Sequence, residues 1–302
     1  MPSGKHSPAS GGKLMQAAVW RAGVCVLGFR RVISLERSDC LVIVRGGGDI
    51  ATGTIHCLAS CGFKVLVLES GQPTTIRRLA AFSEAMYKNE VTVEGICARR
   101  VFKKEDILSA WRQKAVPVIE DTKGLWIKTM APQVVVDAII AKKNTGTDKT
   151  MAPLVIGLGP GFCAGRDVHV VIETMRGHHL GRILRDGYAL PNTGIPGIIA
   201  GIGKERVIHA PAAGTMREAA AIGDLVHQGD VIAWIGDTPV KASIDGVLRG
   251  LLHEGLPVTK GFKIADIDPR ASEQGNCVTI SDKARTIAGG VLQAILMSGM
   301  IG

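Results

Sequence analysis

Residues 207–235 read VIHAPAAGTMREAAAIGDLVHQGDVIAWI, and residues 239–267 repeat this pattern at a constant offset of 32 positions without a gap. Self-similarity at a fixed period indicates one structural unit that is used more than once. Two copies are too few for a solenoid, so the repeat predicts two interlocking halves of one small β module. The matching residues are Ala210, Gly214, Gly223, Val226, Gly229, Ile232, Ala233 and Ile235 in the first copy and Ala242, Gly246, Gly255, Val258, Gly261, Ile264, Ala265 and Ile267 in the second.

A second informative stretch lies upstream, where residues 40–71 read CLVIVRGGGDIATGTIHCLASCGFKVLVLESG. The apolar runs 41–44 and 65–68 are typical of strands that are buried on both faces of a parallel sheet. Between them, residues 49–61 carry apolar side chains at helical spacing, and Gly62 ends that pattern. The stretch therefore predicts a β-α-β unit.

Within this unit, Gly46-x-Gly48-x-x-Ala51 has the spacing of a dinucleotide fingerprint, and Glu69 ends the second strand. Glycines let the backbone approach a pyrophosphate, the helix N-terminus offers free N–H groups, and the acid accepts from a ribose hydroxyl. Asp49 disturbs this pattern because its carboxylate would repel a pyrophosphate; it either caps the helix or holds a metal or polar ligand group. The predicted cofactor-binding residues are Arg45, Gly46, Gly47, Gly48, Asp49, Ile50, Ala51, Glu69, Asp137, Gly157, Gly159 and Gly161.

Asp137 and the three later glycines of that set follow strands that are expected further along the chain. A helix is expected over 105–114 and strands over 116–119, 134–136, 154–156 and 168–172. Ligands collect beyond the carboxyl ends of strands in open α/β sheets, so Glu69, Asp121, Asp137 and the glycine-rich turns after Val44 and Ile156 should face one crevice.

The second glycine-rich turn, 157–165, would bring its backbone close either to a phosphate or to a neighbouring strand; the sequence leaves both open. Cys163, followed by Arg166, is a weak candidate for a catalytic thiol. Lys142, Lys143 and Asn144 are placed to supply cations to the same crevice.

Composition excludes several classes of function. The chain has 302 residues, of which 46% are hydrophobic, 21% charged and 4% aromatic, and this suits a folded protein with room for two domains. Its net charge is +9, but it shows no basic face with aromatic platforms, so no nucleic-acid partner is expected. The early apolar run is cut by Arg21 and closed by Arg30, so no membrane association is expected either. Seven cysteines without paired CxxC motifs predict no disulfide framework, no metal site and a cytoplasmic location.

The domain organisation follows from these patterns. Residues 1–38 are an N-terminal extension that is expected to be disordered, and 39–204 form a Rossmann-like nucleotide- or cofactor-binding domain. Residues 205–270 form the repeat module, and 271–302 contribute a C-terminal helix that starts at Ser281-Asp282 and packs on the first domain. The predicted fold class is α/β, a Rossmann-like doubly wound, mostly parallel sheet followed by a small β barrel-sandwich-hybrid module and a C-terminal helix.

A family resemblance covers the chain from about Leu41 to its end. The chain resembles the selenium-dependent molybdenum hydroxylase system accessory proteins of bacteria. This resemblance implies a maturation protein that binds molybdopterin cofactor or its dinucleotide form and acts on a molybdenum hydroxylase apo-enzyme together with other maturation proteins. The motifs that carry it include VRGGGDIATG (44–53), IRR (76–78), VDAIIAKKN (136–144), APLVIGLGPGF (152–162), DVHVVIETMRGH (167–178), IDGVLRGLL (244–252) and KIADIDPR (263–270).

The repeat module also resembles the hammerhead of biotinyl and lipoyl carriers. A carrier holds its acceptor lysine at the turn between the two halves, whereas Gly236-Asp-Thr-Pro239 occupies that turn here and Lys241 lies further on. Neither biotin nor lipoate is therefore expected.

The sequence thus predicts an accessory protein for a selenium-dependent molybdenum hydroxylase, binding a small anionic cofactor of the molybdopterin or nucleotide type in a Rossmann-like crevice. Two alternatives stay open, an NAD(P)-dependent oxidoreductase and a non-enzymatic binding or scaffold module. Whether the protein catalyses a reaction is not decided by the sequence.

Overall fold

A computed structural model describes residues 35–301 of the chain. Most of the predicted N-terminal extension, 1–38, lies outside these residues. Within the described part of the chain, no helix is long and apolar enough to cross a membrane.

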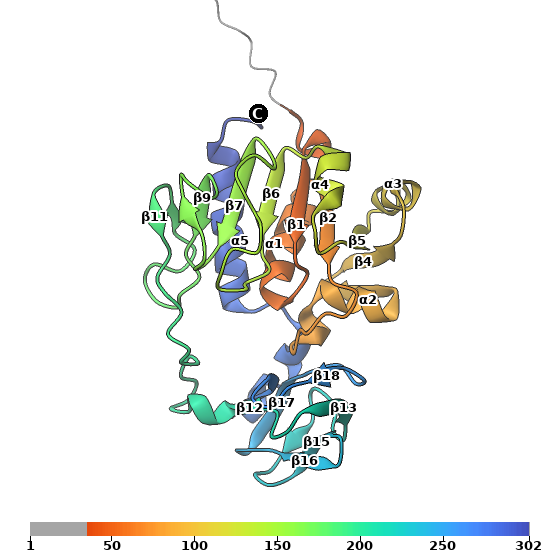
Figure 1. The fold of residues 1–302 in the computed structure, drawn as a ribbon, viewed down its shortest axis with the longest axis vertical. Coiled ribbons are helices and arrows are strands. Elements are labelled where there is room, and N and C mark those ends of the chain that lie inside the picture. The colour runs from red at the N-terminus through yellow and green to blue at the C-terminus, as the bar shows by residue number, and fades with distance from the viewer. Residues whose placement is uncertain (1–34, 302) are drawn as a thin grey trace, which may run out of the picture. The chain divides into compact units, whose positions relative to one another are not determined.

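The larger part of the fold is one nine-stranded sheet with the order β10-β9-β7-β6-β1-β2-β5-β4-β3 (Figure 1). The inner strands run parallel to their neighbours, while β3 pairs antiparallel with β4 at one edge and β10 pairs antiparallel with β9 at the other. The strands are β1 (Leu41–Arg45), β2 (Lys64–Glu69), β3 (Glu90–Val93), β4 (Ile96–Val101), β5 (Val116–Glu120), β6 (Val134–Asp137), β7 (Leu154–Leu158), β9 (Val170–Ile172) and β10 (Ile183–Leu184).

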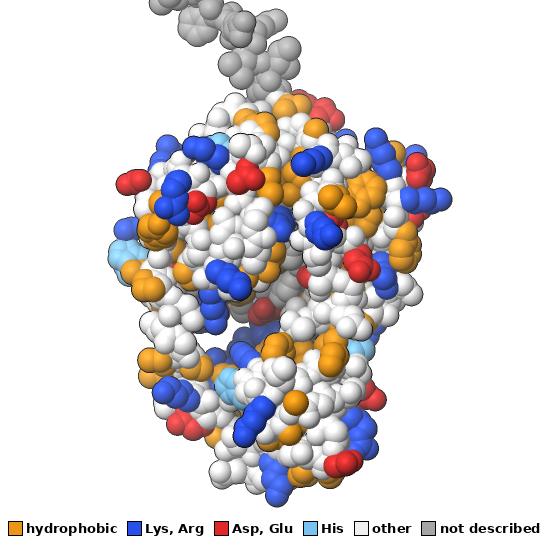
Figure 2. All heavy atoms as spheres, in the orientation of Figure 1, with side chains coloured by type: hydrophobic (Ala, Val, Ile, Leu, Met, Phe, Trp, Pro, Cys, Tyr) orange, Lys and Arg blue, Asp and Glu red, His pale blue; other side chains and the backbone are white. Residues whose placement is uncertain are grey.

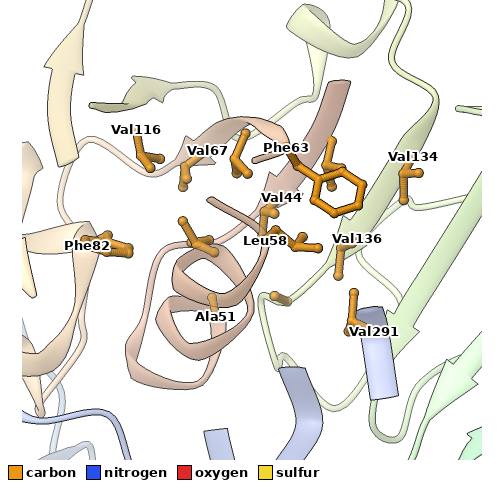
Figure 3. Packing of buried hydrophobic residues seen from close by; sticks show 14 of the residues in the cluster. Val44, Ala51, Leu58, Phe63, Val67, Phe82, Val116, Val134, Val136 and Val291 are labelled. Atoms are coloured by element: carbon orange, nitrogen blue, oxygen red, sulfur yellow. The ribbon is translucent and has the colours of Figure 1, made fainter. Parts of the chain in front are cut away.

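Successive residues of the central strands point to opposite faces of the sheet, and each face has its own core. Val42 and Val44 of β1 pack against α1 (Asp49–Ser60) and α5 (Asp282–Met297). Figure 3 shows Ala51 and Leu58 of α1 facing Val44 and Val136 of the sheet, with Val291 of α5 beside them. On the other face, Leu41 and Ile43 belong to a core that includes residues of α3 (Lys104–Arg112) and α4 (Leu125–Met130).

The two helices on the first face touch closely because a glycine lies at their contact. A Cβ added at Gly53 of α1 would lie 2.7 Å from the carbonyl oxygen of Ala284 in α5. Helix α5 begins after Ser281, whose hydroxyl accepts a hydrogen bond from the Ala284 amide at 3.2 Å. Its starting point thus follows from an ordinary N-cap.

This architecture corrects the predicted fold class. The sheet is mixed, with antiparallel strands at both edges, and neither the connection from β6 to β7 nor that from β7 to β9 contains a helix. A doubly wound sheet requires crossover helices on both faces, and here α5, from the far end of the chain, covers the strands that lack them. The Rossmann-like sheet followed by a barrel-sandwich hybrid is therefore wrong as a description of the fold.

The repeat region forms two four-stranded antiparallel sheets, β12-β19-β17-β14 and β16-β15-β13-β18. Strand β13 of the first copy pairs with β18 of the second, and β17 of the second pairs with β14 of the first. The two copies therefore interlock, as the constant offset predicts. The strands are β12 (Val207–His209), β13 (Gly214–Glu218), β14 (Leu225–Val226), β15 (Val231–Ile235), β16 (Thr238–Lys241), β17 (Gly246–Leu251), β18 (Pro257–Val258) and β19 (Lys263–Asp268).

The segment that follows β2 contacts this repeat module directly. Arg78 donates from Nε to the Leu251 carbonyl oxygen at 3.1 Å and from Nη2 to the Glu218 carboxylate at 2.7 Å. The amide of Leu251 in turn donates to the carbonyl oxygen of Ile76 at 2.8 Å. The remaining elements are α2 (Ala85–Lys88), β8 (Cys163–Ala164), β11 (Gly187–Tyr188) and the 3-10 turns η1 (Arg37–Asp39), η2 (Arg78–Ala80), η3 (Phe82–Glu84), η4 (Lys204–Arg206) and η5 (Ala271–Val278).

Candidate functional site

The first glycine turn, which follows β1, uses part of its hydrogen-bonding capacity inside the protein. The Gly46 amide donates to the Leu68 carbonyl oxygen at 2.8 Å, and the Gly47 amide donates to Glu69 Oε2 at 2.7 Å. The other oxygen of Glu69 accepts from the Ser70 amide at 2.7 Å. Burial raises the pKa of Glu69, although these backbone donors act in the opposite direction. Both carboxylate oxygens of Glu69, the acid of the predicted dinucleotide fingerprint, thus accept hydrogen bonds from the backbone.

Arg45 and Asp137, which end the neighbouring strands β1 and β6, form a buried network. Arg45 Nη1 lies 3.4 Å from Asp137 Oδ2 and also contacts the Thr147 hydroxyl, which donates to Asp137 Oδ2 at 2.6 Å. The Ile139 amide donates to the other Asp137 oxygen at 3.1 Å. Burial raises the pKa of Asp137, and Thr147 and Arg45 oppose that shift. These interactions hold the segment after β6 against the end of β1.

Asp49 does not cap the helix that it begins. The N-cap of α1 is Gly48, and no side-chain oxygen accepts from the helix N-terminus. The Asp49 carboxylate instead lies 3.6 Å from Nη1 of Arg77, a residue that is 6% exposed. The capping alternative is therefore wrong, and Asp49 serves as the acidic partner of a buried arginine.

The second glycine turn is shaped by its own neighbours. A Cβ at Gly157 would lie 2.6 Å from the Phe162 ring, one at Gly159 2.4 Å from Thr174 Oγ1, and one at Gly161 2.8 Å from the Lys143 backbone. The Gly159 amide donates to the Ile172 carbonyl oxygen at 2.9 Å. Of the two alternatives for this turn, the structure shows close packing against adjacent chain.

Cys163 lies apart from the crevice, in β8. Its amide donates to Asp167 Oδ2 at 2.8 Å, and its thiol contacts the Ala164 carbonyl oxygen at 3.7 Å. Arg166, the neighbouring cation, is paired with Asp167 at 2.8 Å. That pairing removes the local positive charge on which the prediction of a reactive thiol depended.

A large cavity of about 840 Å³ opens beyond the carboxyl ends of β1, β2 and β6. It is lined by most of the predicted residues of the first turn, and Lys142 lies in its wall as expected. Gly47, Asp137 and the second glycine turn do not line it. The predicted residues on its wall are Arg45, Gly46, Gly48, Asp49, Ile50, Ala51 and Glu69.

A second cavity of about 370 Å³ adjoins the first and shares Asp49, Lys142 and Lys263 with it. We call it the cationic cavity because basic side chains from distant parts of the chain line it, whereas its acids are Asp49 and Asp266. Figure 2 shows basic side chains gathered around the hollow in the middle of that view. The basic residues that line it are Arg77, Lys142, Arg176, Arg206, Arg249, Lys263 and Lys283.

The arginines of this cavity have protein partners, but the lysines lack them. Arg206 pairs with Asp266, and Arg249 lies 3.8 Å from the same carboxylate. Within residues 35–301, no carboxylate lies within 4.0 Å of the amino groups of Lys142, Lys263 or Lys283.

The positive charges of the cavity also disfavour one another. Desolvation by the cavity walls lowers the pKa of Lys263; Asp266 and Asp49 oppose this shift, whereas Arg206 and Lys142 add to it. Desolvation and then Arg176 lower the pKa of Lys283, and Asp49 acts in the opposite direction. Burial and then Arg249 lower the pKa of Arg77, against the effect of Asp49 and Asp266, and its Nε atom is buried without a hydrogen-bond partner among the described residues. The cavity therefore holds more positive charge than its two acids compensate.

The turn after β6 adds backbone strain at the border of both cavities. Ile140 and Lys142 have φ angles of 58° and 63°, and such angles are rare for residues other than glycine and unusual for a β-branched one. Strained backbone of this kind clusters at ligand sites. The two residues line both cavities.

Sequence reasoning missed most of this cationic cavity. Arg77, Arg249 and Lys263 all fall within motifs that carried the family resemblance, namely IRR, IDGVLRGLL and KIADIDPR. Their presence in short motifs was the available signal, but nothing in the sequence indicated that these separate segments meet. Within residues 35–301, no group of three or more His, Cys, Asp or Glu side chains is arranged to hold a metal ion.

Comparison with known proteins gives one strong sequence match. A protein of Escherichia coli (strain K12) described as uncharacterized protein YqeB is 50% identical over 257 residues. These residues make up 85% of this chain and 47% of YqeB, so the chain spans about half the length of that relative. No protein-family model matches the chain. The resemblance to the selenium-dependent molybdenum hydroxylase accessory proteins thus stays a prediction.

Similarity to solved structures is weak. The ectoine utilization protein EutE (DoeB) from Ruegeria pomeroyi is 10% identical with a TM-score of 0.23, covering 75% of this chain and 85% of that chain. An aspartoacylase family protein from Mesorhizobium loti is 12% identical with a TM-score of 0.23, covering 76% and 84%. TcdA (CsdL) is 12% identical with a TM-score of 0.26, covering 85% and 89%.

The site corrects the predicted function, a cofactor-binding maturation protein of a molybdenum hydroxylase or an NAD(P)-dependent oxidoreductase. The structural neighbours are described otherwise, as an ectoine utilization protein and as an aspartoacylase family protein. The internal bonding of Gly47 and Glu69 agrees with this correction, because it removes two groups on which nucleotide binding depended. TM-scores this low transfer no activity to the present chain.

Proposed function

We propose that this protein binds a small molecule that carries several anionic oxygens, as phosphate or carboxylate groups, in the cationic cavity. The observation that supports the proposal is the set of three lysines, Lys142, Lys263 and Lys283, that line one cavity without an acidic partner among the described residues. Lys142 and Lys263 are exposed and Lys283 is half-buried, so their ammonium groups are open to a ligand, and an anionic group would offset the mutual repulsion of the cations.

The origin of the lining residues supports small-molecule binding further. Lys142 comes from the turn after β6, Arg249 and Lys263 from the repeat module, and Lys283 from α5. A ligand in this position would contact three parts of the fold that are far apart in the sequence, and binding sites commonly lie between structural units. The surrounding arginines can donate two parallel hydrogen bonds to one phosphate or carboxylate group.

The test is isothermal titration calorimetry with inorganic pyrophosphate and with citrate, which separate phosphate from carboxylate recognition. Lys263→Gln and Lys283→Gln each remove one charge without breaking an ion pair of the protein. A charged hydrogen bond contributes roughly 1.5–3 kcal/mol, so each variant should weaken the preferred anion about tenfold or more.

The matched control is Lys260→Gln, which removes an exposed lysine from the same module outside the cationic cavity. Unchanged affinity in this variant, beside losses at Lys263 and Lys283, would support the cavity as the binding site. Equal losses in all three variants would indicate only a general effect of net charge, and the absence of binding by both anions would refute the proposal.

We also propose a reducing, cytoplasmic setting. The described cysteines are all free, and Cys57 and Cys61, four residues apart at the end of α1, remain unlinked.

A further inference from the structure

The large cavity differs in character from the cationic cavity that it joins. Several of its charged side chains already have partners in the protein. Glu69 accepts from two amides, and Asp121 accepts from the amides of Lys123, Gly124 and Trp126. Arg45 is held by Asp137, as described above. Apart from Lys142 and Lys263, the charged side chains of this wall therefore have partners within the protein.

The rest of the large cavity is mainly apolar, with a few hydroxyl groups. Ile50, Ile76, Ile139 and Phe262 contribute apolar surface. Thr74 adds a hydroxyl for which no partner is seen among the described residues. A wall that is mostly apolar, with a few polar groups for orientation, is typical of pockets that take organic ligands.

The unpaired lysines lie where the two cavities meet. Lys142 and Lys263 line both cavities, whereas Lys283 lines only the cationic one. The unpaired positive charge thus lies where the two cavities meet, and the large cavity of about 840 Å³ extends from it.

From this juxtaposition we infer that the ligand has two parts, an anionic end in the cationic cavity and an uncharged, largely apolar organic body in the large cavity. This inference rests on the proposed function, because the body is positioned by the binding of the anionic end. It narrows the ligand class from any small polyanion to organic phosphates or carboxylates whose uncharged part is at least as large as one ring. Inorganic anions then occupy only part of the site.

The experiment compares 1-naphthyl phosphate, inorganic phosphate and 1-naphthol by calorimetry on the full chain. We expect 1-naphthyl phosphate to bind at least tenfold more tightly than either of the other two, because only this compound fills both cavities. Lys263→Gln should weaken its binding and that of phosphate by the same factor.

A cavity-filling variant separates the two parts of the site. Ala141 is exposed on the wall of the large cavity, so Ala141→Trp should weaken 1-naphthyl phosphate at least tenfold and leave phosphate unchanged. Ala219→Trp is the matched control, because Ala219 is exposed on the repeat module and lines neither cavity. If Ala141→Trp fails to fold, the comparison of the three compounds on the unmodified chain still tests whether the ligand has two parts.

The outcomes distinguish the two proposals. If phosphate or pyrophosphate binds through the lysines but the naphthyl group adds no affinity, the two-part ligand is refuted and the proposed function stands. If Ala141→Trp weakens the binding of phosphate and of 1-naphthyl phosphate equally, the organic body of the ligand does not bind in the large cavity, and the inference is also refuted. If none of the anions binds, both proposals fail.

Discussion

Two adjacent glycines of α5 provide a test of how this helix packs on the sheet. A Cβ added at Gly290 would lie 2.3 Å from the carbonyl oxygen of Gly181 and 3.0 Å from a methyl carbon of Ile172. A Cβ added at Gly289 would meet nothing within 4 Å, and that residue is exposed. Gly289→Ala and Gly290→Ala thus make the same chemical change at an exposed and at a buried position of one helix turn.

The expected difference in the free energy of unfolding follows from two effects. Alanine is favoured over glycine in a helix interior by about 1 kcal/mol, and this gain is common to both variants. Overpacking against backbone costs roughly 1–3 kcal/mol and applies only to Gly290→Ala. Gly289→Ala should therefore be more stable than the unmodified chain, and Gly290→Ala should be less stable than Gly289→Ala by the overpacking cost.

Urea denaturation followed by circular dichroism measures this difference directly, provided that the slopes of the two transitions agree. A difference of about 1–3 kcal/mol corresponds to several degrees in melting temperature for a domain of this size. If the two variants were equally stable, Gly290 could not lie against Gly181, and the placement of α5 on the sheet would be refuted.

Three further predictions concern the site. Because the cavity lowers the pKa of Lys263 and Lys283, affinity for pyrophosphate should be full below these pKa values and fall as pH rises through them, with proton uptake on binding that calorimetry in buffers of different ionisation enthalpy detects. Asp49→Asn removes a carboxylate from the cationic cavity and should strengthen pyrophosphate binding several-fold; weaker binding would show that Asp49 supports the ligand. Gly157→Ala would press on the Phe162 ring and should lower the melting temperature without changing anion affinity, whereas a selective loss of affinity would restore a ligand role for that turn.

Much of the local structure could be predicted from the sequence. The apolar runs 41–44 and 65–68 form β1 and β2, and the residues between them form α1, because strong periodicity and a terminating glycine leave little choice. The interlocked repeat was also predictable, since the constant offset fixes which strands are equivalent. These features depend on interactions between residues that are near in sequence or related by a strict rule.

The fold class could not be predicted correctly, and the reasons lie at the edges of the sheet. Strands β3 and β10 are only four and two residues long, so their sequences give a weak strand signal. The connections from β6 to β7 and from β7 to β9 lack helices, and the cover that a doubly wound sheet would place there comes from α5. The packing of α5 on these strands joins parts of the chain that are far apart in the sequence, so local sequence patterns do not predict it.

The site shows the same division between local and long-range information. Charged residues such as Arg77, Arg249 and Lys283 are far apart in the sequence, and a single basic residue is ordinarily a solvated one. Only folding brings them to one cavity. The glycine turns gave a strong local signal, but glycine serves ligand approach and close backbone packing equally well, so that signal could not decide between them.

The decisive distinction is whether a group already has a partner within the protein. Glu69 and the Gly47 amide suggested a nucleotide, yet each satisfies the other at 2.7 Å, so neither needs a ligand to account for its presence. Lys263 and Lys283 carry no such explanation: the cavity walls disfavour their charge, and no carboxylate among residues 35–301 pairs with them. The cationic cavity gathers more basic side chains than its two acids can pair, and an external anion would offset their mutual repulsion. The ligand site therefore lies with the unpaired lysines, and the glycine turns position the chain around it.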